Sequence, residues 1–170
     1  MNTFLKSVFV GLLIMASSFA TQAQEKLAYV NTEQVMLGMA AFKQAETQLQ
    51  TFSAQKEEEL NRRVQTYQTA IQDLQQKIES GGITELQRQQ KVQEISQMEQ
   101  DIQQFRVKAE YDVSAKQEEY LAPIRQQVYD AVQTVSSENG YTFVFDLSAG
   151  ILLSYPPEGD ITALVQAKLP

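Results

Sequence analysis

Carboxylates are the side chains of this sequence that come closest to a catalytic or metal-binding pattern. The chain contains no Cys, His or Trp, which excludes disulfides, thiol nucleophiles, histidine acid/base pairs and ordinary zinc sites. Carboxylate catalysis and calcium binding by oxygen ligands remain conceivable. However, the densest carboxylate cluster, residues 57–59, lies within a helical pattern, where a solvated helix face is the simpler interpretation. We therefore expect no enzyme activity, no catalytic residue, no metal and no cofactor.

Charge and composition exclude further classes of partner. No glycine-rich phosphate cradle is present, so nothing in the sequence indicates ATP binding. Without the export segment described next, the chain has 13 basic and 21 acidic residues, a net charge of −8. An acidic protein of this kind is a poor partner for nucleic acid or for an anionic membrane surface.

The first 23 residues have the pattern of a cleavable signal peptide. Lys6 supplies the positive charge, Val8 to Ala16 the apolar stretch, and Thr21 and Ala23 the small residues before a cleavage site ahead of Gln24. The apolar run is short for an uncleaved membrane anchor. We expect an exported protein.

A long stretch after this segment has the periodicity of two facing helices. Apolar residues recur at steps of three and four from Phe42 to Ile78, and again from Leu86 to Val128. The pattern predicts helices at about residues 33–79 and 84–138. Lys56 falls where an apolar residue is expected, and we interpret this as a stutter in the supercoil.

Two adjacent glycines separate the predicted helices. Helices of these lengths measure roughly 70 and 80 Å. If the chain reverses at Gly81 and Gly82, nearly equal arms return residue 141 to the side of residue 30. We therefore predict a hairpin arm over residues 33–138 with its tip at 80–83.

Local signals set the limits of the second helix. Thr84 is placed to cap its start, with Gln87 completing the capping pattern, and Gly140 follows its end. Pro123 lies inside the pattern and should kink or break the helix, which predicts a hinge near residues 121–124.

Short strand-like runs flank the helical block at residues 26–31, 141–146 and 151–155. Asp160 then opens a last short helix. The predicted fold class is α+β: a long antiparallel, coiled-coil helical hairpin that projects from a small β-sheet body. The apolar residues expected on one face of the last helix are Ile161, Leu164 and Val165.

The body, residues 24–32 and 139–170, is too small to form a stable core alone without disulfides or metal. We therefore expect copies of the chain to associate through it. The residues expected in this oligomer body are Leu27, Tyr29, Val30, Tyr141, Phe143, Val144, Phe145, Ile151, Leu152 and Leu153.

Four segments together resemble the Skp (OmpH-like) family of periplasmic chaperones. They are "KLAYVNTEQVM", "YLAPIRQQVYDAVQTVSSENGYTFVFD", "GILLSY" and "PPEGDITALVQAKL". The resemblance covers essentially the whole chain after the signal peptide. It implies a periplasmic homotrimer whose three arms extend like tentacles around a cavity, where unfolded outer-membrane β-barrel proteins are held without ATP.

The charge of the arm departs from the best-known members of this family, which are basic. Residues 60–104 hold five basic and six acidic residues. This balance puts electrostatic capture of acidic clients, and contact with lipopolysaccharide through basic residues, in doubt.

The expected function is therefore that of a holdase chaperone, with an envelope spacer or adaptor that binds one folded partner as the alternative. Unfolded clients would be held by many weak contacts from the arms. The same seam positions also serve to bind the two helices together. The candidate client contacts are Val64, Tyr67, Ile71, Ile95, Met98 and Phe105.

Overall fold

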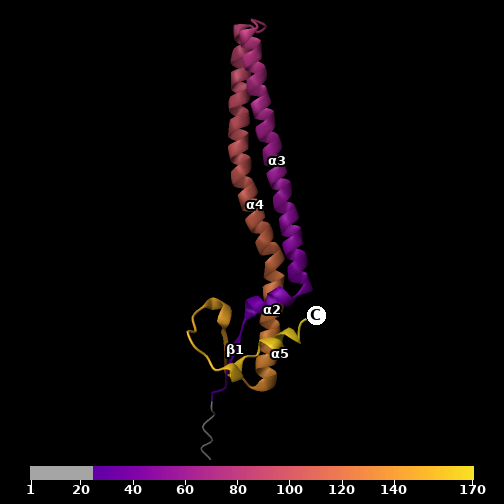
Figure 1. Cartoon of the computed structure of the whole chain (residues 1–170), viewed down its shortest axis with the longest axis vertical. Coiled ribbons are helices and arrows are strands. Elements are labelled where there is room, and N and C mark those ends of the chain that lie inside the picture. Colours follow the sequence, from indigo (N-terminus) through magenta and orange to yellow (C-terminus); the bar gives the residue numbers. More distant parts are fainter. Residues whose placement is uncertain (1–24) are drawn as a thin grey trace, which may run out of the picture.

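The computed structural model describes residues 25–170 as a long two-helix arm that projects from a small body (Figure 1). Helix α3 (Ala40–Glu79) runs outward and α4 (Glu85–Asn139) returns, so both ends of the arm meet the body. The predicted α+β fold is confirmed. The predicted signal peptide lies outside the described residues. None of the helices between residues 25 and 170 combines the length and the hydrophobicity of a membrane-spanning segment.

The body contains a two-stranded parallel sheet. Strand β1 (Leu27–Val30) pairs with β2 (Phe143–Asp146), and Tyr29 lies opposite Phe145. On the other side of β1, the Ile161 N–H donates to the carbonyl of Tyr29 at 2.8 Å, next to a single bridge between Tyr29 and Asp160. The hairpin therefore brings distant strands together, as predicted.

The prediction of a third strand at residues 151–155 is wrong. A short 3-10 helix, η2 (Leu147–Ala149), follows β2, and the chain then runs without regular structure to η3 (Pro157–Gly159). Gly150 has a φ of 66°, which turns the chain away from the sheet. Asp160 occupies the free side of β1, and within the described range residues 151–155 pair with no strand, the open edge of β2 included.

The first predicted helix is divided into two. Helix α2 (Thr32–Gly38) ends at Met39, which has an extended backbone with φ −77° and ψ 134°, and α3 begins at Ala40. The Met39 side chain is 4% exposed and packs into the body core. Burial of this side chain, together with the low helix propensity of Gly38, accounts for a break that periodicity alone does not reveal.

Helix α4 keeps the predicted ends. The Thr84 hydroxyl accepts from the Gln87 N–H at 3.3 Å, while the Thr84 N–H donates to Gln87 Oε1 at 3.0 Å. Gly140 closes the helix with a φ of 67°. Pro123 lies inside α4 and does not break it. Ile124, immediately after the proline, is buried in the core and holds this part of the helix in place.

The last helix, α5 (Thr162–Gln166), starts two residues after Asp160, whose carboxylate accepts from the Thr162 N–H at 2.8 Å. Ile161 and Val165 are buried, as expected from their spacing. Leu164 is 48% exposed, which shows that it does not share their buried face.

One hydrophobic core fixes the body and the base of the arm. It joins β1, α2, α5 and the C-terminal part of α4. Full burial of each branched side chain contributes roughly 1.5–3 kcal/mol. The largest of the fully buried side chains are Val30, Val35, Val135, Ile161 and Val165.

Candidate functional site

The outer arm, residues 60–104, leaves much of its apolar seam uncovered. Within this range only Leu74 and Ile102 are buried, whereas Leu86 is 67% and Val92 48% exposed. A helix with a single neighbour can cover only one narrow stripe of its surface. The arm therefore presents apolar side chains to its surroundings along most of its length.

None of the six candidate client contacts is buried. Ile71 is exposed, and the other five are half-buried along the seam: Val64, Tyr67, Ile95, Met98 and Phe105. Met98 lines a shallow groove of about 190 Å³, which we call the arm groove. Phe105 is partly covered, because the Arg63 guanidinium lies 4.4 Å from its ring centroid. The residues that line the arm groove are Arg62, Arg63, Thr66, Met98, Asp101 and Ile102.

Lys56, interpreted above as a stutter, joins the two helices of the arm. Its Nζ lies 2.7 Å from Asp112 Oδ2 and 5.1 Å from the ring centroid of Phe52. Hydrogen bonds from Lys56 and Lys108 hold the pKa of Asp112 below its usual value. Sequence reasoning missed this pair, since a basic residue at a seam position gives no sign of its partner.

The sheet of the body has one covered face and one open face. Ala28 and Val30 point into the core, and the alternate residues Leu27 and Phe143 are 43% and 50% exposed. Leu153, in the loop that follows, is fully exposed. We call the open face, with this loop, the body surface; it comprises Leu27, Tyr29, Phe143, Phe145, Ile151, Leu153 and Tyr155.

Aromatic rings dominate the body surface. The Tyr29 ring stacks on the Phe145 ring with a distance of 6.3 Å between the ring centroids. The centroid of the Tyr155 ring lies 5.5 Å from that of Tyr29. Three of the predicted oligomer residues belong to the core of their own chain. Val30 is buried in this core, and Tyr141 and Val144 pack against it. Leu152 is half-buried, and the other predicted residues form a surface of the type that protein partners cover.

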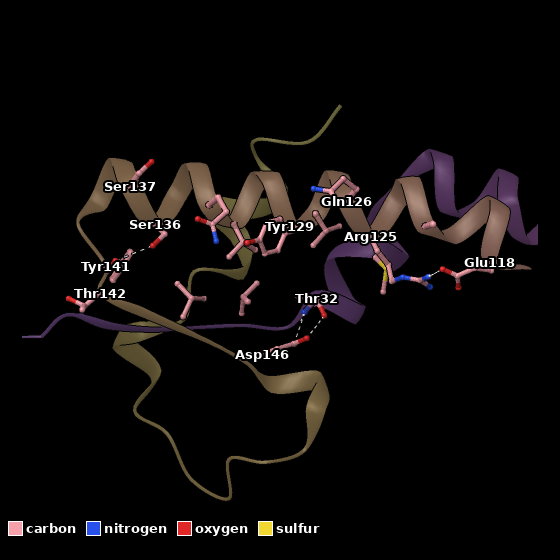
Figure 2. A pocket seen from close by; sticks show the side chains of 17 residues that line it. Thr32, Glu118, Arg125, Gln126, Tyr129, Ser136, Ser137, Tyr141, Thr142 and Asp146 are labelled. Atoms are coloured by element: carbon pink, nitrogen blue, oxygen red, sulfur yellow. Dashed lines mark hydrogen bonds and ion pairs between the residues drawn. The ribbon is translucent and has the colours of Figure 1, made fainter.

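A groove of about 940 Å³ lies between β2 and α4 (Figure 2). Val144 lines one side, and Val132 and Tyr129 line the other. Because β2 pairs only with β1 among the described residues, its second edge is open beside this groove. An open strand edge beside apolar side chains can accept another extended chain.

Asp146 fixes the base of this groove, a role that the sequence did not reveal. Its carboxylate accepts from the Thr32 hydroxyl at 2.6 Å and from the Thr32 N–H at 3.3 Å (Figure 2). It also accepts from the Ser148 N–H at 2.9 Å. Burial raises the pKa of Asp146, but these hydrogen bonds outweigh it, and the pKa lies below its usual value.

The described residues contain no group of three or more acidic residues arranged to hold a metal ion. The features with functional potential are thus two surfaces that differ in character, the partly exposed seam of the arm and the apolar body surface.

A family model described as outer membrane protein (OmpH-like) matches residues 26–169. The chain belongs to the OmpH-like family. The resemblance drawn from the four sequence segments is confirmed. Chaperone protein Skp of Pectobacterium atrosepticum is 31% identical over 147 residues, which cover 81% of this chain and 82% of that protein.

A solved OmpH-like structure has the same fold. The crystal structure of an OmpH-like outer membrane chaperone from Caulobacter crescentus CB15 matches with a TM-score of 0.73 at 18% identity, over 85% of this chain and 83% of that one. The relatives in this OmpH-like family are thus described as chaperones, and the arm and body found here are features of their common fold.

Proposed function

We propose that this OmpH-like protein is a periplasmic, ATP-independent holdase that binds unfolded outer-membrane β-barrel proteins and prevents their aggregation. The observation that carries the proposal is the apolar seam of the outer arm, which is only partly covered by the partner helix. The family supports it, because a relative at 31% identity is a chaperone named Skp.

The arm is suited to weak, repeated contact with a disordered chain. Its apolar side chains, such as Ile71 and Met98, are accessible at intervals along the helices. Each contact is modest, but several arms around one client raise the effective concentration of binding sites. Met98 adds adaptability, because an unbranched thioether can fit clients of different shape.

The body surface supports assembly of several copies. A single chain leaves Phe143 50% and Ile151 79% exposed, and the edge of β2 beside the groove unpaired. Covering this surface with further copies would remove apolar area from water at roughly 25 cal/mol per Å². The family resemblance favours three copies, whose arms would enclose a client cavity.

Aggregation of a barrel protein tests the function directly. A urea-unfolded outer-membrane β-barrel protein is diluted into buffer with the purified protein, and light scattering is followed without nucleotide. We expect suppression at about one assembly per client, because binding lowers the concentration of free unfolded chain. Unchanged scattering at a large excess of the protein would show that it is not a holdase.

A further inference from the structure

The outer arm presents its basic residues already paired with carboxylates. All five basic side chains between residues 60 and 104 contact a carboxylate on the same helix. The Arg88 Nη2 to Glu85 Oε1 and Lys91 Nζ to Glu94 Oε2 distances are both 2.6 Å. The pairs of Lys77, Arg88 and Lys91 are each close to neutral for a partner that approaches from outside, whereas Arg62 and Arg63 share the one carboxylate of Glu59 and keep one positive charge between them.

The charges that remain without a partner are negative. In the fully described range 60–104, Glu79, Glu99 and Asp101 form no ion pair. Gln97 donates to Asp101 at 2.8 Å, and this amide contact leaves the carboxylate charge uncompensated. With Glu59 included, residues 59–104 hold five basic and seven acidic residues, a net charge of −2, which disfavours anionic chains at short range and favours cationic ones.

The arm groove places one of these carboxylates, Asp101, beside apolar side chains. Met98 and the buried Ile102 form its apolar lining, and Asp101 lies at its rim. Arg62 and Arg63 also line the groove, but both contact Glu59, with Arg63 Nε at 2.8 Å from Glu59 Oε1. Arg62, Arg63, Glu59 and Asp101 together carry no net charge, and Asp101 is the one among them that forms no ion pair.

We propose that the outer arm selects unfolded chains of neutral or positive net charge, which it binds through apolar side chains, and discriminates against strongly acidic chains. The proposal rests on the holdase function and specifies its client class. Glutamines reinforce it, since residues 51–104 include 14 of them, and uncharged amides can bond to the free backbone groups of any unfolded chain.

Two fluorescein-labelled peptides of equal length test the selection. They share their apolar residues and carry either lysines or glutamates between them, and anisotropy gives their affinities for the full mature protein. At low ionic strength, we expect the lysine peptide to bind about fivefold more tightly. The preference should shrink near 0.15 M salt, where the Debye length is only about 8 Å.

Variants that remove acidic charges test whether the preference for the lysine peptide arises in the outer arm. Glu99→Gln/Asp101→Asn should remove most of the preference, whereas Glu46→Gln/Asp130→Asn, with the same change in net charge outside the outer arm, should preserve it. Glu59→Gln should free Arg62 and Arg63 and tighten binding of the glutamate peptide about threefold. Circular dichroism checks that each variant is folded.

Three results would overturn the selection: tighter or equal binding of the glutamate peptide, an equal loss of preference in the two double variants, or failure of both peptides to bind. The barrel aggregation assay, run on the same samples, separates the two proposals. Continued protection of the barrel client would leave the holdase function standing while the charge selection falls.

Discussion

At the scale of single residues, two polar contacts connect parts of the chain that are distant in sequence. Asp146 ties the end of β2 to the start of α2 through Thr32. Lys56 ties α3 to α4 through Asp112. Both depend on tertiary placement, so neither partner could be identified from local sequence. Their removal should affect the body and the arm separately.

Replacement of Asp146 by Asn should destabilise the body and reduce its sensitivity to acid. A group whose pKa is depressed on folding stabilises the protein above its unfolded pKa, about 3.9, and that stability is lost as the pH falls through the folded pKa. Urea unfolding at neutral pH and at about pH 3 measures the difference between the proteins. Asp130→Asn, at an exposed position of α4, is the control; an equal effect of both variants would contradict the role of Asp146.

Replacement of Lys56 by Ala should loosen the middle of the arm. The change removes the ion pair with Asp112 and the contact with Phe52, and we expect a measurable fall in the free energy of unfolding. Hydrogen exchange should rise around residues 52–60 and 105–113 and stay unchanged in the body. Lys43→Ala, nearer the base of α3 and outside any ion pair in the described residues, is the matched control. Equal exchange in the two variants would contradict the proposed link.

At the scale of elements, the arm was predictable and the details of the body were not. The apolar seam from Phe42 to Val128 and the two glycines at the tip are local signals, and they predict the helical hairpin. Because the hairpin has nearly equal arms, it also predicts that β1 and β2 lie side by side. Residues 151–155 have strand-forming composition, but Asp160 takes the place beside β1, and the loop does not pair with the open edge of β2 in a single chain. The break at Met39 likewise depends on core packing.

The two glycines of the tip should respond differently to alanine. Gly81 has a φ of 67°, which costs an alanine roughly 1–2 kcal/mol, whereas a Cβ on Gly82 meets only the Ser80 hydroxyl, at 3.2 Å, and Lys77 O, at 3.9 Å. Gly81→Ala should therefore lower the melting temperature more than Gly82→Ala. Neither change should alter the oligomeric state, which size-exclusion chromatography measures. Loss of assembly in either variant would mean that the tip has another role.

Pro123 offers a test of the predicted hinge. Alanine at this exposed position can donate the N–H that proline lacks, and we expect the free energy of unfolding to rise by about 1–3 kcal/mol. If the proline provides a hinge, hydrogen exchange at residues 119–124 should slow in Pro123→Ala. Unchanged exchange there would indicate that α4 is already rigid at this point.

At the scale of the whole molecule, we expect the body surface and the outer arm to have separate roles, assembly and client binding. The body surface, with Phe143, Phe145 and Leu153 exposed, would hold copies together. The outer arms would bind clients and carry most of the freedom to adapt. A chain that keeps residues 24–50 and 110–170 with a short linker should therefore still assemble, and it should fail to protect a barrel client from aggregation.

The most direct test is the mass of the purified mature protein, measured by native mass spectrometry with and without an unfolded outer-membrane barrel protein. We expect three copies alone, and three copies with one client chain after the client is added. A monomer under both conditions, or an assembly whose mass does not change when the client is present, would contradict the proposed holdase.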